Sequence, residues 1–135
     1  MAAVLQTVGG PFNGEPVPLV AQDSLWFVIR VNSNLRAQYI LFHRDANSPE
    51  WKEIASGKGS GSQRVDQAIG NLRLDSLGWI VVCAPLNSGT FPVHVQLFQG
   101  SETTGFMPIS RIAQYDVTQG AGSALQPIKD TVKLV

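Results

Sequence analysis

The amino-acid sequence predicts an all-β protein, a single-domain antiparallel β-sandwich that is jelly-roll-like, with about eight strands and at most one short helical turn. First, the 13 glycines and 8 prolines fall mainly between apolar runs, as they do between short strands. Second, these runs are rich in aromatic and β-branched residues, which favour strands. Third, they recur at spacings of about 8 to 12 residues, which is typical of sandwiches. A chain of 135 residues is long enough for one domain.

The strongest strand signals in the first half of the chain come from two neighbouring apolar runs. Residues 9–18, which precede them, hold too much glycine and proline for a helix. Residues 25–31 are almost wholly apolar, which predicts a central strand covered on both faces. Turn residues follow at 32–34 and a second apolar run at 37–44. We expect these two strands to pair as an antiparallel hairpin.

A less regular region follows the second strand. Residues 45–50 have the composition of a connection, and residues 51–56 predict a short strand. The glycines and serines of residues 57–62 predict a flexible loop. Residues 65–77 combine apolar positions at helical spacing with a stretch that alternates. We interpret this segment as one helical turn followed by a strand.

The second half of the chain opens with an apolar run and a clear alternation. Residues 79–84 predict a buried strand, and residues 85–89 have the composition of a hairpin loop. Residues 91–97 alternate between apolar and more polar side chains, which is the cleanest period of two in the sequence.

Two further strand patterns complete the chain. Residues 106–116 predict one strand or two strands interrupted at Pro108. Residues 128–135 predict a final strand, although Asp130 on its apolar parity weakens the pattern. From the four strongest strand patterns we expect one core that includes Trp26, Val28, Ile40, Phe42, Ile80, Val82, Val93 and Val95.

Charge in this chain is sparse and balanced. Ten Lys and Arg residues face ten Asp and Glu residues, and charged residues make up 15% of the chain. This balance gives no net field to attract a polyanion, so no nucleic acid partner is expected. Weak self-repulsion and apolar side chains in the end segments predict a homo-oligomer. In one interpretation residues 1–18 and 120–135 are extended arms that contact neighbouring copies, and in the other they are edge strands of the chain's own sandwich.

Cysteine usage and the N-terminal residues bear on the compartment. Cys83 is the only cysteine, so no intramolecular disulfide forms, and its apolar neighbours predict a buried, unreactive thiol. The first residues lack the basic start and long apolar core of a signal peptide. No apolar run approaches the about 20 residues that a membrane-spanning helix needs. We expect cytoplasmic synthesis and no membrane span, with release by a non-classical route left open.

The segment 43–51 carries the most promising binding residues. It groups hydrogen-bond acceptors, a guanidinium and an indole in a connection expected to be exposed. An aromatic face covers the apolar side of a pyranose, while planar amides and carboxylates bind its hydroxyls. In the alternative, the indole packs under the loop and the polar side chains cap the turn. The predicted ligand-binding residues are His43, Arg44, Asp45, Asn47, Glu50 and Trp51.

Patterns for catalysis and for metal binding are weak in comparison. Asp45 and Asn47 have the spacing that begins an EF-hand loop, but the required glycine is missing and Glu50 comes too early. Residues 57–60 lack the rest of a Walker phosphate loop, and no Gly-x-Ser-x-Gly elbow occurs. We therefore predict no catalytic residues, no metal ligands and no cofactor.

Three function classes fit these observations. The first is a non-catalytic binding module for a carbohydrate or surface ligand, which uses loops at one end of the sandwich and acts as an oligomer. The second is a structural or assembly subunit of a particle, fibre or toxin. The third is a small hydrolase, which for glycoside hydrolysis would need two carboxylates at a defined separation across a cleft. We expect the first class, and hence no enzyme activity.

Overall fold

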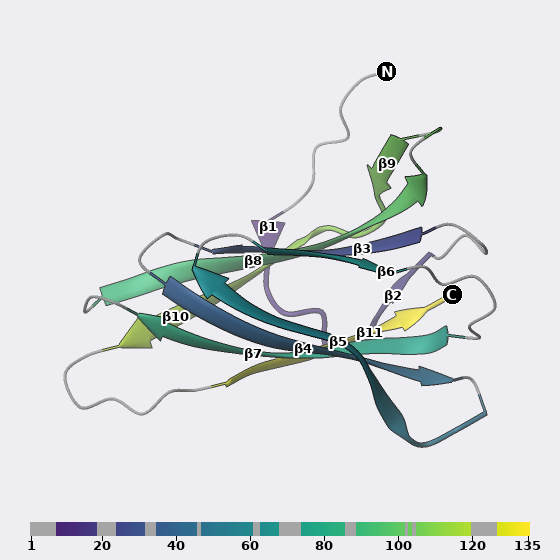
Figure 1. Ribbon diagram of the computed structural model, residues 1–135, viewed down its shortest axis with the longest axis horizontal. Coiled ribbons are helices and arrows are strands. Elements are labelled where there is room, and N and C mark those ends of the chain that lie inside the picture. The colour runs from purple at the N-terminus through teal and green to yellow at the C-terminus, as the bar shows by residue number, and fades with distance from the viewer. Residues whose placement is uncertain are drawn as a thin grey trace.

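Two β-sheets packed face to face make up the computed structural model of the chain (Figure 1). The structure describes residues 8–18, 24–31, 35–45, 47–60, 63–67, 74–85, 89–101, 103, 105–119 and 127–135. Every regular element in these residues is a strand, which confirms the predicted all-β sandwich. The jelly-roll connectivity stays a prediction. No helix in the described residues is long and apolar enough to span a membrane.

We name the two layers sheet A, with six strands, and sheet B, with five. The pairing order in sheet A is β1 (Val8–Gly9), β10 (Ile112–Gln119), β8 (Gly89–Ser101), β3 (Ser24–Val31) and β6 (Gln63–Gln67), and β9 (Gly105–Pro108) also pairs with β8. The order in sheet B is β2 (Glu15–Val17), β11 (Pro127–Leu134), β7 (Leu74–Pro85), β4 (Leu35–Asp45) and β5 (Trp51–Ser60). The short β1 and β2 pair parallel to β10 and β11, and the other pairs are antiparallel.

Two predicted hairpins are wrong, because their strands lie in different sheets. Strands β3 and β4 belong to sheets A and B, and the same separation holds for β8 and β7. In a sandwich, a connection can cross between layers as well as turn back within one layer. The apolar pattern of a strand is the same in both cases, so the sequence does not distinguish them.

Two local predictions are also corrected. Residues 63–67 form β6, which pairs with β3, where a helical turn was expected. Strand β5 continues to Ser60, through residues assigned to a flexible loop. Both segments gain ladder hydrogen bonds from a neighbouring strand, and this tertiary pairing overrides weak local preference. The interruption at Pro108 is confirmed, since β9 ends there and β10 begins at Ile112.

The core between the sheets is built from the parity opposite to the predicted one on three of the four strands. Val93 and Val95 are buried as expected. The other six residues expected in the core are only half-buried and lie on the outer faces of the sheets: Trp26, Val28, Ile40, Phe42, Ile80 and Val82. The buried residues in their place are Leu25, Phe27, Ile29, Tyr39, Leu41, Trp79, Val81 and Cys83. Both parities of these strands are apolar, so periodicity could not choose between them.

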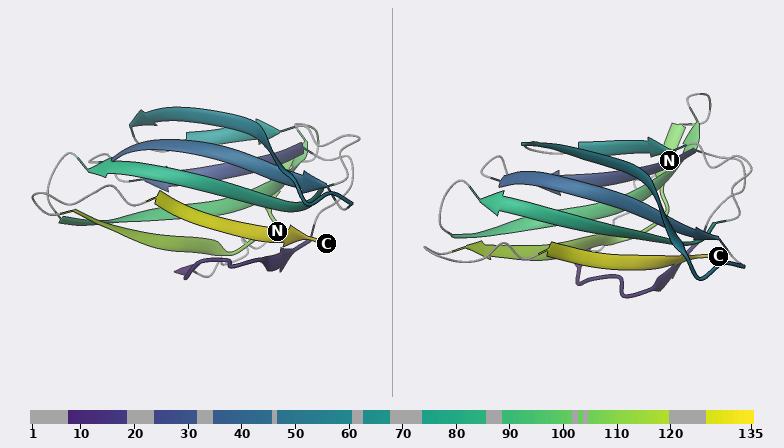
Figure 2. Two further views of the ribbon diagram at one scale, coloured as in Figure 1. Left: turned by 90° about the horizontal axis from the view of Figure 1, so that it is seen from below. Right: turned by 60° about the horizontal axis from the view of Figure 1, so that its bottom comes forward.

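Both end segments complete the sandwich in their described parts. The segment from β1 to β2 passes from sheet A to sheet B along the edge formed by β10 and β11 (Figures 1 and 2). Phe12 and Val17 from this segment, and Val132 and Leu134 from β11, are buried in the core. Residues 8–18 and 127–135 therefore follow the edge-strand alternative, while the remainder of the segments considered as arms lies outside the described residues.

Cys83 provides a test of the core by pH. It is 1% exposed, and burial raises the pKa of its thiol from an ordinary 9.0 to about 11. The folded state therefore holds this proton more tightly than the unfolded state. The tighter proton binding stabilises the folded state by an amount on the order of 2 kcal/mol. This stabilisation is complete below pH 9 and is lost as the pH rises through 11. Urea denaturation should show a steeper loss between pH 9 and 11 for the wild type than for Cys83→Ala; parallel curves would contradict this burial.

Candidate functional site

The six residues predicted to bind a ligand do not form one site. His43 points into the sandwich and is buried, with its Nδ1 atom 3.3 Å from Asp45 Oδ1. Asn47 and Glu50 are exposed in the connection between β4 and β5. Arg44 and Trp51 form a second close pair, on the outer face of sheet B and apart from His43 and Asp45.

A hollow of about 420 Å³ occupies this outer face, and we call it the sheet B hollow. Its volume lies in the range of roughly 300 to 1,000 Å³ that small-molecule sites usually have. It opens over β4, β7 and β11, whose residues Phe42, Gly78 and Thr131 lie side by side in register. Its lining consists of Asn13, Phe42, Trp51, Gly78, Trp79, Ile80, Lys129, Asp130 and Thr131.

The indole of Trp51 forms one wall of the hollow because Gly78 leaves room for it. A Cβ atom at Gly78 would lie 3.2 Å from Trp51 Cζ3 and 3.4 Å from Thr131 Cγ2. The guanidinium of Arg44 lies 5.3 Å from the centre of the Trp51 ring, within the range of a cation–π contact. Trp51 nevertheless stays 41% exposed. Gly78 and Arg44 thus hold the indole in place, and its exposed part remains available to a ligand.

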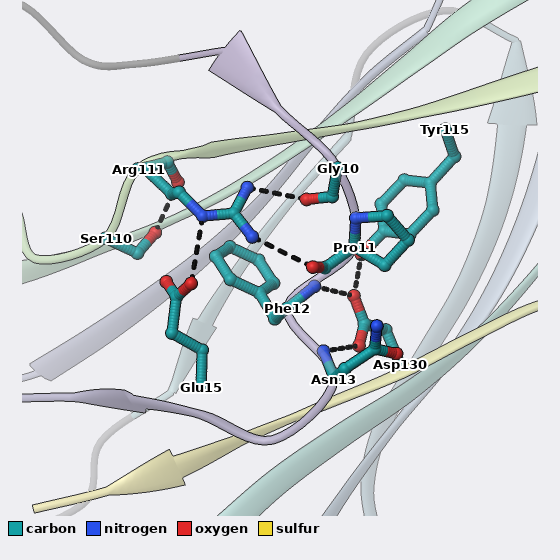
Figure 3. Close-up of polar contacts among 9 residues, drawn as sticks. All are labelled: Gly10, Pro11, Phe12, Asn13, Glu15, Ser110, Arg111, Tyr115 and Asp130. Atoms are coloured by element: carbon teal, nitrogen blue, oxygen red, sulfur yellow. Dashed lines mark hydrogen bonds and ion pairs between the residues drawn. The ribbon is translucent and has the colours of Figure 1, made fainter.

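Asn13 reaches the hollow from a turn that Asp130 fixes (Figure 3). The carboxylate of Asp130 accepts hydrogen bonds from the backbone N–H groups of Phe12 and Asn13, at 2.7 and 2.8 Å. It also accepts one from the N–H of Thr131 at 2.8 Å and one from the Tyr115 hydroxyl. These four donors satisfy a carboxylate that is 6% exposed.

Burial, followed by the hydrogen bond to Asp130, raises the pKa of the Tyr115 hydroxyl far above its ordinary range. Tyr115 therefore stays a neutral donor at physiological pH, and the hydrogen bond to the carboxylate persists. Asn13 has a φ of 50° and Gly14 a φ of 79°. Asparagine and glycine tolerate this left-handed region best, so the Asn-Gly pair suits the turn.

Arg111 secures the same segment from the side of sheet A (Figure 3). Its Nη1 and Nη2 atoms donate to the carbonyls of Gly10 and Pro11, at 2.5 and 2.9 Å. Its Nε atom lies 3.1 Å from Glu15 Oε1, and its guanidinium lies 4.8 Å from the centre of the Phe12 ring. Phe12 in turn meets Trp79 edge to face at 5.7 Å. The segment that carries Asn13 is therefore anchored by Arg111 as well as by Asp130.

Polar groups around the hollow are left available for a ligand. Within the described residues, the Asn13 carboxamide, the Lys129 ammonium and the Thr131 hydroxyl have no side-chain hydrogen-bond partner. Among those residues no cluster of His, Cys, Asp or Glu is arranged to hold a metal ion. The site thus offers an aromatic wall, apolar side chains and three polar groups.

Most of the residues that line this site were not predicted from the sequence to bind a ligand. Phe42 and Ile80 were assigned to the core, and Asn13, Gly78, Lys129 and Thr131 were not considered. The Asn-Gly pair and the extra glycine in an apolar strand were the available signals. Comparisons of the chain with family models, curated protein sequences and solved structures found no match. The geometry alone therefore carries the functional argument.

Proposed function

We propose that this chain is a non-catalytic binding module that holds a saccharide in the sheet B hollow. The observation that carries the proposal is the half-exposed indole of Trp51, fixed over Gly78 beside polar side chains for which the described part of the chain provides no side-chain hydrogen-bond partner. The site lies on a sheet face, which moves the expected binding surface away from the loops at one end.

The apolar C–H groups and the polar hydroxyls of a saccharide both find matching groups in the hollow. The C–H groups of a pyranose ring need a flat apolar surface, which Trp51 and Phe42 offer. Its hydroxyls need directional donors and acceptors, and the amide of Asn13 and the hydroxyl of Thr131 can act as both. Apolar walls with a few placed polar groups are the usual composition of small-ligand sites.

Binding at one such hollow is expected to be weak, because the hollow is open and a sugar loses hydration on entry. Several copies of the site on a homo-oligomer would raise the overall affinity without new contacts. Self-association is therefore part of the proposed function, and residues on sheet A are the candidates for it.

Trp51→Ala should weaken saccharide binding at least about tenfold, equivalent to roughly 1.4 kcal/mol. The substitution removes the stacking wall and leaves the sheets paired, so the melting temperature should change little. A glycan array would identify the ligand, and isothermal titration calorimetry would measure the affinity of both proteins. An array with no binding, or equal affinities, would contradict the proposal.

Met107→Ala is the matched control. Met107 is 40% exposed, close to the value for Trp51, but it lies on β9 in sheet A. Its loss should leave the affinity unchanged. Gly78→Val is a second probe, because its side chain would occupy the space over which the indole lies. It should block binding while keeping a residue that favours strands.

A structural or assembly subunit is the second candidate, and the outer face of sheet A favours it. Trp26 and Phe106 stack there with ring centres 3.5 Å apart, and Phe98 lies opposite Trp26 in register. These three side chains are half-buried, and the part of the apolar cluster that remains exposed is of the kind that commonly marks contacts between chains. Light scattering after size-exclusion chromatography tests the second candidate, since a strict monomer would contradict a structural subunit. Saccharide binding by such a monomer would keep the binding module and contradict only its self-association.

A further inference from the structure

We propose that the sheet B hollow prefers an acidic saccharide, one that carries a carboxylate or sulfate on the bound sugar unit. This inference rests on the proposed function and specifies its ligand class. Three observations support it: the charges on the outer face of sheet B, the state of the one carboxylate in the lining, and the position of Lys129.

The outer face of sheet B is strongly basic although the whole chain is neutral. Residues opposite one another in the register share a face, so the pairing of β4, β5, β7 and β11 defines this surface. Among the described side chains, its one acidic residue is Glu53, which does not line the hollow. Its basic residues are Arg36, Arg44, Lys58, Lys129 and Lys133.

The carboxylate within the lining does not offset this charge toward a ligand. Asp130 is buried and turns its oxygens to three backbone N–H groups and to Tyr115. A ligand hydroxyl would have to compete with four donors to reach these oxygens. A ligand therefore meets no free carboxylate in the described lining, and its polar contacts there are the neutral groups of Asn13 and Thr131 and the ammonium of Lys129.

Lys129 places a positive charge at the hollow itself. It is exposed on β11, opposite Ile80 in register, and both residues line the hollow. Arg44 adds a second positive charge at the opposite wall, where its guanidinium contacts the Trp51 ring. An anionic group on a sugar that stacks against Trp51 would lie between two cations, and because the hollow is open, dissolved salt should weaken their attraction for it.

A single-stranded nucleic acid is the competing anionic ligand with flat rings. Proteins that bind it without sequence preference stack successive bases on several aromatic side chains along a basic groove. The described part of this face offers Trp51 and Phe42, and both belong to the same hollow. One ring-sized site suits a single sugar unit better than a run of bases.

Matched ligand pairs test this inference. We would titrate the wild-type protein with an oligogalacturonate and with the same oligomer after reduction of its carboxyl groups. A heparin oligosaccharide and its desulfated form provide the corresponding pair for sulfate. At least one acidic ligand should bind about tenfold more tightly than its neutral partner, and this difference should shrink at high salt.

Lys129→Gln assigns the preference to the hollow. It should remove most of the difference within the preferred pair, with the larger loss of affinity falling on the acidic ligand. Lys52→Gln is the control, because Lys52 is an exposed cation on β5 that does not line the hollow; it should keep the full difference.

The outcomes separate the two proposals. Equal affinity within both pairs would overturn the acidic preference and leave saccharide binding intact, as would a preference that Lys129→Gln does not reduce. Absence of binding to all four ligands and to a glycan array would overturn both proposals. Tighter binding to oligothymidylate than to any saccharide would replace the acidic saccharide with a nucleic acid.

Discussion

Replacing Asp130 with alanine should lower the free energy of unfolding by about 3 to 5 kcal/mol. The carboxylate is buried and accepts from the backbone of Phe12, Asn13 and Thr131 and from the hydroxyl of Tyr115. Alanine offers none of these donors an acceptor, and Phe12 and Tyr115 are themselves buried. An unpaired buried donor costs about 1 to 3 kcal/mol, so several of them together account for the size of the effect.

Urea denaturation followed by circular dichroism would measure this loss. Asp116→Ala is the control, because Asp116 is exposed on β10 and, among the described residues, accepts one exposed hydrogen bond, from Gln114 Nε2 at 3.1 Å. Its loss should stay within about 0.5 kcal/mol. Asp130→Asn should be intermediate, since the amide keeps one acceptor oxygen but turns an NH₂ group toward the remaining donors. Equal stability of Asp130→Ala and Asp116→Ala would show that the N-terminal segment is not held by this carboxylate.

The same substitution links the fold to the proposed site. Asp130 fixes the turn that presents Asn13 to the hollow. It also precedes Thr131 on the same strand and accepts a hydrogen bond from the Thr131 backbone N–H. A chain with Asp130→Asn that remains folded should therefore bind saccharide more weakly than wild type. Stability and binding depend here on one buried group because the segment that seals the core also carries a binding residue.

Asp130 also illustrates what the sequence could and could not predict. An acidic residue on the apolar parity of residues 128–135 weakens the strand that the sequence predicts there. The strand exists, and the carboxylate is buried because donors from residues more than a hundred positions away surround it. A partner so distant in sequence leaves no local pattern. Buried polar groups that are fully hydrogen-bonded are compatible with a core, but only the fold shows that the bonds exist.

Strand positions were largely predictable, whereas strand faces were not. Alternation placed Val93 and Val95 correctly because the intervening residues on β8 are more polar. On β4 and β7 both parities are apolar, and Tyr39 and Trp79 point inward while Ile40 and Ile80 lie outside. Because of this error the candidate site could not be predicted, since side chains that line the hollow were expected in the core. Apolar residues that cluster on an outer face are thus a functional signal that periodicity alone misreads.

Gly100→Ala should be the most disruptive exchange of a glycine in the described part of sheet A. A Cβ atom at Gly100 would lie 2.0 Å from the carbonyl oxygen of Gly105, and Gly100 has a φ of 154°. The obstacle is backbone, so no side-chain rotation can relieve it. Strand β9 would have to move away from β8, and Phe106 would leave its stack with Trp26. We expect a loss of about 3 kcal/mol or more in the free energy of unfolding.

Gly105→Ala separates steric overlap from backbone strain in the same hairpin. Gly105 has a φ of 79°, but a Cβ atom there would meet nothing within 4 Å. Its replacement should cost only the left-handed conformation of a residue with a side chain, about 1 to 2 kcal/mol. Tryptophan fluorescence should shift toward that of solvent-exposed indole in Gly100→Ala, because Trp26 loses the ring that covers it, and should stay near wild type in Gly105→Ala. Identical spectra and stabilities for the two variants would mean that β9 does not pack on β8 as closely as this geometry requires.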